Sequence, residues 1–249
     1  MDLSTWIPLF SEWLGVIAVT MIASASPALK KIRRVEYMFT RREFNYALFI
    51  FAVEFVLAFQ FFSNKFFAPW RAFADQFAGG ATAERALLAL ICLVPFVIAL
   101  VARKQPWKAI GWNQPNLRAA LSVGFLLALL TIFLTGKFMT VIRGVSKEQA
   151  GALGIFLLLA IAEETIFRGY IQGRMQSFLG QRWGWVVTGV MYALWQLPGR
   201  LWVMPSASMW VIVLISLVQG LICGYVMDKT GHVAAPILYR AFSLWMSVF

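Results

Sequence analysis

The sequence is poor in charge, in cysteine and in histidine, and each shortage excludes a class of protein. Charged residues make up 13% of the 249 residues and hydrophobic residues make up 61%. Soluble domains average about 25% charged and roughly 45–50% apolar, so this chain cannot cover a water-soluble globule with polar groups. Its two cysteines, Cys92 and Cys223, lie in apolar runs, which excludes a disulfide framework or a cysteine-based metal cluster. We therefore expect an integral membrane protein. Its two adjacent glutamates, Glu163 and Glu164, have no histidine nearby and make a poor transition-metal site, so we expect no metal or other cofactor.

The apolar residues form eight runs of about the length of a membrane-spanning helix. Such a helix needs roughly 20 predominantly apolar residues to cross a hydrocarbon core of about 30 Å. The predicted spans are Trp6–Ala25, Phe44–Phe62, Ala86–Val101, Ala119–Thr135, Gly151–Ile171, Trp183–Leu197, Ala207–Met227 and Val233–Phe249. No internal repeat or long linker divides them. We predict an all-α fold, a polytopic transmembrane helical bundle of about eight spans that forms one integral membrane domain over residues 1–249.

Basic residues gather in short stretches between these runs, as in cytoplasmic loops, and the net charge of +11 therefore does not indicate a nucleic-acid partner. With the amino terminus outside, fourteen basic residues would lie on the inner side: Lys30, Lys31, Arg33, Arg34, Arg41, Arg42, Arg103, Lys104, Lys108, Arg118, Arg168, Arg174, Arg182 and Lys229. Seven would lie outside: Lys65, Arg71, Arg85, Lys137, Arg143, Lys147 and Arg200. The positive-inside rule thus predicts an outside amino terminus. We expect the chain to sit in the lipid bilayer of a plasma (inner) membrane.

A few ionisable residues fall inside the spans, where they are costly and mark functional sites. Glu12 is close to the start of its span, so we expect it at the membrane interface. Glu54 lies near the middle of a span, either as a protonated carboxyl bonded to a neighbouring helix or as a functional group. Arg240 lies in the last span and needs a carboxylate partner inside a bundle.

The cluster of Glu163, Glu164 and Arg168 is the most informative of these. Glu164 and Arg168 are spaced i and i+4, so they share a helix face and can pair. Glu163 is rotated by about 100° and lies about 18 Å along the helix from Gly151, which predicts a free carboxylate in the cytoplasmic half of the bilayer. A free carboxylate there suits a general base acting on water. An ordinary ion pair that closes a helix end is the alternative interpretation.

These residues resemble a known family motif. The segment Glu163-Glu164-Thr165-Ile166-Phe167-Arg168-Gly169-Tyr170 is similar to the EExxxR motif of the CPBP family (CAAX-processing and bacteriocin-processing, or Abi) of intramembrane glutamic endopeptidases. The resemblance covers residues 151–249, whereas residues 1–135 are generic helices. It implies a helical bundle whose active site lies in the membrane and opens to the cytoplasm. In it Glu163 would activate water, Glu164 and Arg168 would form a structural pair, and the substrate would be a membrane protein or peptide.

The second and third motifs depart from the family pattern. Tyr192-Ala193-Leu194-Trp195-Gln196 stands where the family has FxxxH, so that Gln196 replaces the histidine. Arg240 and Leu244 replace the histidine and the asparagine of HxxxN. The single histidine, His232, lies eight residues before Arg240 at a predicted cytoplasmic helix start, where we expect it to be exposed.

Two functions are consistent with these replacements, and the sequence leaves open whether the chain is an enzyme. In an altered protease, Gln196 would orient the water and Arg240 would stabilise the tetrahedral intermediate. In an inactive pseudo-protease, Arg240 would pair with Glu163 and make it a poor base, and the bundle would serve as a scaffold or accessory subunit of a membrane protein complex. Transport is a weaker third interpretation, because no paired inverted segments with interrupted helices are evident. Compactness and the family resemblance favour a bacterial plasma membrane.

Overall fold

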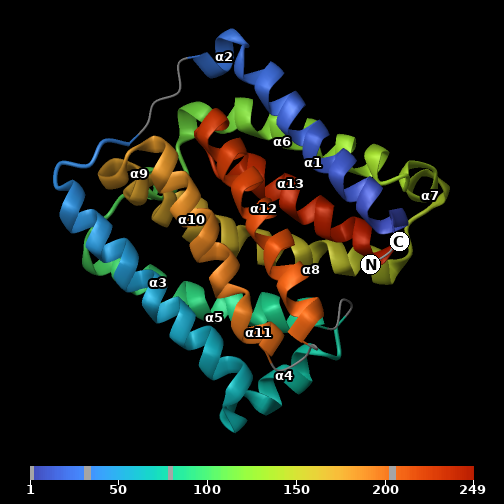
Figure 1. Ribbon diagram of the computed structural model, residues 1–249, viewed down its shortest axis with the longest axis horizontal. Helices are drawn as coiled ribbons and strands as arrows, with labels where there is room; N and C mark the ends of the chain where they lie inside the picture. The colour runs from blue at the N-terminus through green and yellow to red at the C-terminus, as the bar shows by residue number, and fades with distance from the viewer. Residues whose placement is uncertain (1–2, 31–34, 78–80, 202–205) are drawn as a thin grey trace.

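The structure, a computed structural model, describes residues 3–30, 35–77, 81–201 and 206–249 (Figure 1). The regular structure of these residues is entirely helical, as predicted. The elements are α1 (Leu3–Ser24), α2 (Pro27–Lys30), α3 (Thr40–Ser63), η1 (Lys65–Phe67), α4 (Ala68–Ala74), α5 (Ala81–Ala102), η2 (Trp107–Ile110), α6 (Gln114–Leu134), α7 (Phe138–Arg143), α8 (Lys147–Glu164), η3 (Thr165–Gln172), α9 (Gly173–Leu179), α10 (Gln181–Trp195), α11 (Leu197–Leu201), α12 (Ser206–Thr230), α13 (Ala234–Trp245) and η4 (Met246–Val248). Lys31, Arg33 and Arg34 of the predicted basic loop lie outside the described residues.

Six helical segments in the described part of the chain are long and apolar enough to cross a membrane. They are Trp6–Ser24, Thr40–Ser63, Ala81–Ala102, Trp107–Leu134, Lys147–Leu179 and Met209–Thr230. The other two predicted spans are the shorter helices α10, of 15 residues, and α13, of 12 residues. Figure 1 shows α13 at the centre of the bundle, where it packs against α6 and α8. Because α13 is enclosed by protein, it does not have to match the thickness of the bilayer, which explains why this helix is short.

The segment that carries the family motif is longer and less regular than predicted. It begins at Ser146, whose hydroxyl accepts from the Gln149 N–H (3.2 Å) while the Gln149 side chain accepts from the Ser146 N–H (2.9 Å), a capping box. From α8 the chain continues through η3, a π-helix, into α9. Glu163 is therefore the seventeenth residue of the 33-residue span Lys147–Leu179. The helical segment thus continues past Ile171, the predicted end of this span, and the position of Glu163 toward the cytoplasmic side stays a prediction.

The two ends of α10 define two ends of the bundle. Figure 1 shows α9 at the left and α11 toward the bottom, with α10 between them. We call these the α9 end and the α11 end. The described residues of the predicted inner loops, such as Arg103 and Lys108 around η2, belong to the α9 end, because η2 packs against η3. Arg85 near the start of α5 and Gln196 after α10 belong to the α11 end.

Candidate active site

Glu163 is buried, with no exposed side-chain surface, and both oxygens of its carboxylate have partners. Arg85 of α5 forms an ion pair with it, with Nη2 3.1 Å from Oε1. The Gln196 amide nitrogen lies 3.4 Å from the same oxygen, and the Tyr192 hydroxyl donates to Oε2 at 2.7 Å. The prediction of a free carboxylate is therefore wrong: three donors from α5 and the α10 segment converge on it.

Arg240 of α13 reaches Glu163 only through Tyr192. Its Nη2 donates to the Tyr192 hydroxyl at 3.0 Å, and this hydroxyl in turn donates to Glu163. The expected direct pair between Arg240 and Glu163 is not among the ion pairs of the described residues. Tyr192 thus bridges the two charges, so that a tyrosine, a glutamine and two arginines surround the carboxylate, where the family resemblance implies histidines.

Glu164 and Arg168 form the predicted pair, with Nε 3.2 Å from Oε2. The Arg168 Nη2 also donates to the Gly220 carbonyl of α12 at 3.0 Å, and the guanidinium lies 4.5 Å from the Tyr192 ring centroid. These contacts tie the π-helix to α10 and α12. The pair therefore holds the helix that carries Glu163 in place.

Sequence reasoning missed Arg85 and Tyr192 as members of this cluster. Arg85 directly precedes the predicted span Ala86–Val101, where the sequence predicts an outer loop. Its position at the edge of an apolar run is the one signal that it could reach into the bundle. Tyr192 was noted as a replacement for the motif phenylalanine, and the hydroxyl that this replacement adds was the available signal. In both cases the partner lies far away along the chain, 78 and 29 residues from Glu163.

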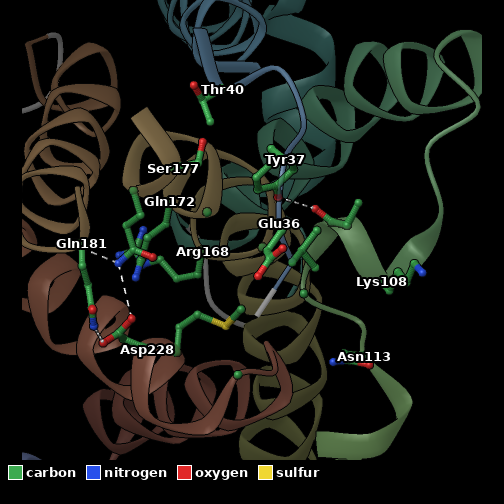
Figure 2. A pocket seen from close by; sticks show the side chains of 18 residues that line it. Glu36, Tyr37, Thr40, Lys108, Asn113, Arg168, Gln172, Ser177, Gln181 and Asp228 are labelled. Carbon is green, nitrogen blue, oxygen red and sulfur yellow. Dashed lines mark hydrogen bonds between the residues drawn. The ribbon is translucent and has the colours of Figure 1, made fainter. Parts of the chain in front are cut away.

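Two pockets formed by described residues lie at opposite ends of the bundle, and Glu163 lines neither of them. A cavity of about 40 Å³ at the α11 end is lined by Arg85, Gln196 and Arg200, among others, and has room for about one water molecule. A pocket of about 450 Å³ at the α9 end is lined by Arg168, but not by Glu163 or Gln196 (Figure 2). The Glu163 side chain has no exposed surface.

His232 is buried, 1% exposed, so the expectation of an exposed histidine is wrong. Its Nδ1 accepts from the Ala234 N–H at 2.9 Å, and its ring meets Trp112 edge to face with centroids 5.5 Å apart. The side chain thus caps the first turn of α13, where backbone N–H groups lack helical partners. Burial lowers the pKa of His232 to about 4. Its role is to secure a helix, away from the Glu163 cluster.

This burial predicts a loss of stability in acid. The unfolded chain takes up a proton at a pKa near 6.5, whereas the folded protein does so at about 4. Between these values the unfolded state binds more protons, so stability falls as the pH decreases and is unaffected by this group above about 6.5. From pH 7 to pH 5 we expect His232 to cost about 2 kcal/mol of unfolding free energy. His232→Asn keeps an acceptor for the cap but does not titrate, and unfolding measured at both pH values should show a smaller decrease in this variant.

The two remaining intramembrane carboxyls are buried in the bundle. Glu12 is 3% exposed. Glu54 is 1% exposed, and neither oxygen of its carboxyl has a hydrogen-bond partner among the described residues, so the bond expected to a neighbouring helix is not observed there. Both cysteines are buried and free, as expected.

Fold and site together define a polytopic helical membrane protein with a Glu-Glu-x-x-x-Arg motif in its interior. Residues 146–246 match the family described as type II CAAX prenyl endopeptidase Rce1-like. This match confirms the CPBP-family resemblance over the segment that carries the three motif positions, with the second and third motifs altered. Neither a curated protein nor a solved structure matches the chain.

Proposed function

We propose that this chain is a CPBP-like membrane protein that has lost hydrolysis and works by binding. The proposal rests on the burial and pairing of Glu163. Its side chain has no exposed surface, and Arg85, Tyr192 and Gln196 all donate to its carboxylate. A general base needs a water within hydrogen-bond reach and a way to pass the proton on. A buried carboxylate that is held in an ion pair is a poor base, because the neighbouring positive charge favours its charged form.

The replacements at the histidine positions support the same conclusion. An amide such as that of Gln196 donates and accepts hydrogen bonds but does not exchange a proton near neutral pH, and the Arg240 guanidinium is always protonated. Gln196 instead donates a hydrogen bond to the buried Glu163 carboxylate, and Arg240 donates one to the Tyr192 hydroxyl, so both side chains suit a structural network. The same contacts would also orient a water in an altered protease, so the two functions must be separated by experiment.

In this proposal the whole chain, residues 1–249, is one membrane domain that acts as a scaffold or accessory subunit and contacts a membrane-protein partner. The charge distribution and the family resemblance support a bacterial plasma membrane with the amino terminus outside. The inner side would then be the α9 end.

The test compares protein termini in membranes of cells that carry the wild-type chain or Glu163→Gln at equal amounts of folded protein. We expect no terminus that depends on Glu163, because the wild-type carboxylate does not activate water. A companion pull-down in mild detergent should recover a membrane-protein partner with both chains. A new terminus that requires Glu163 would overturn the proposal and establish the altered protease, with Gln196 orienting water and Arg240 stabilising the tetrahedral intermediate.

A further inference from the structure

The small cavity at the α11 end borders the Glu163 cluster without being part of it. Its volume is about 40 Å³, and the residues that line it include Phe62, Glu84, Arg85, Gln196 and Arg200. They come from the end of α3, the start of α5, the end of α10 and α11 (Figure 1). Glu163 itself does not line the cavity, so a ligand can bind there whether or not the protein hydrolyses anything.

Arg200 of α11 brings a positive charge to this cavity without a carboxylate to pair with it. The residue is half-buried and takes part in none of the ion pairs of the described residues. Burial and the positive charge of Arg85 lower the pKa of Arg200 to about 10. The guanidinium therefore stays protonated at neutral pH, in surroundings that disfavour its charge. An anion that bound beside it would compensate this charge.

Two further side chains in the wall have hydrogen-bond donors to spare. A guanidinium carries five N–H donors, of which Arg85 uses one on Glu163, and the Arg85 side chain is 15% exposed. The amide nitrogen of Gln196 carries two N–H groups, and one of them donates to Glu163. Arg85, Gln196 and Arg200 can therefore place N–H groups in the same small space from three different helical segments.

The charges at this cavity leave one positive charge over. The neighbouring segments that lie outside the described residues, 78–80 and 202–205, contain no ionisable residue. The ionisable side chains that line the cavity or act on those that do are Arg85, Arg200, Arg240, Glu84 and Glu163. Arg71 and Asp75, whose charges act on Glu84, cancel each other. Three arginines thus face two glutamates, and Glu163 is already paired with Arg85.

We propose that this cavity binds a chloride ion between Arg85 and Arg200. A cavity of about 40 Å³ has room for about one water molecule, so a monatomic anion fits and a sulfate or phosphate group does not. The free N–H of Gln196 would be a third donor to the ion. The chloride would separate two arginines that otherwise repel each other and would join α5 to α11. Glu84 opposes binding, because its carboxylate lies in the same wall.

The experiment measures chloride binding to the full-length protein in detergent by the broadening of the chloride NMR line, with gluconate as the replacement anion at constant ionic strength. We expect a broadening that saturates with chloride and that bromide displaces. Arg200→Gln should weaken chloride binding at least about tenfold, the scale of one hydrogen bond to a charged group. Glu84→Gln removes the opposing charge and should strengthen binding about threefold, as expected for a partly exposed pair of charges.

A matched variant controls for net charge. Arg118→Gln removes an exposed cation from outside the cavity and should bind chloride as the wild type does. Thermal unfolding of each variant verifies that it is folded. Chloride binding that Arg200→Gln leaves intact, or that Glu84→Gln does not strengthen, would overturn the proposal. So would the absence of chloride binding together with Arg200-dependent binding of phosphatidylglycerol in native mass spectrometry, which would assign the free charge to a lipid phosphate.

Discussion

Replacing Arg85 with methionine should lower the free energy of unfolding by about 3–5 kcal/mol, the usual cost of leaving a buried charge without its partner. The physical reason is the position of Glu163, whose side chain has no exposed surface and cannot turn toward water when its ion-pair partner is lost. The measurement is thermal or denaturant unfolding in detergent, followed with a thiol-reactive dye. Such a dye reports unfolding because Cys92 and Cys223 are both buried in the folded protein.

The reverse change should cost less. Arg85 is 15% exposed at the side chain and lines the small cavity at the α11 end, so after Glu163→Gln its guanidinium can reach water. We expect a loss of about 1–2 kcal/mol, since a neutral amide still accepts hydrogen bonds. The double variant Arg85→Met with Glu163→Gln removes both charges and should recover most of the stability lost in Arg85→Met. If Arg85→Met were as stable as wild type, the ion pair would not hold the cluster together.

The helices could be predicted from the sequence because membrane-spanning helices appear in it as long apolar runs. All eight predicted runs are helical in the described residues, and the spacing of Glu164 and Arg168 predicted their ion pair. The environment of Glu163 could not be read in the same way. Its partners Arg85 and Tyr192 come from other helices, and only packing determines which side chains of distant helices meet.

The same limit explains the error at His232. This residue lies at the end of an apolar run, where a polar residue normally reaches the membrane interface. In the structure His232 is buried and caps α13, the central helix of the bundle. A helix in that position cannot be distinguished by composition from one that faces lipid.

The π-helix η3 could not be predicted from the sequence either. It places Gly169 against the backbone of η2. A Cβ atom at this position would lie 2.1 Å from the Ile110 carbonyl oxygen and 3.1 Å from a Val233 methyl. The backbone of η2 cannot move away freely, because the Gly111 carbonyl accepts from the Val233 N–H at 3.1 Å. Gly169→Ala should therefore destabilise the protein by about 3 kcal/mol, at the upper end of the usual cost of overpacking.

Gly154 provides the matched control on the same continuous helix. A Cβ atom there meets nothing within 4 Å, so Gly154→Ala should leave stability unchanged or raise it by up to about 1 kcal/mol through the better helix propensity of alanine. The dye-monitored unfolding of both variants tests the close approach of η3 to η2. If Gly169→Ala matched Gly154→Ala in stability, the π-helix would not pack against the Ile110 carbonyl. The wall that it contributes to the pocket at the α9 end would then be built differently.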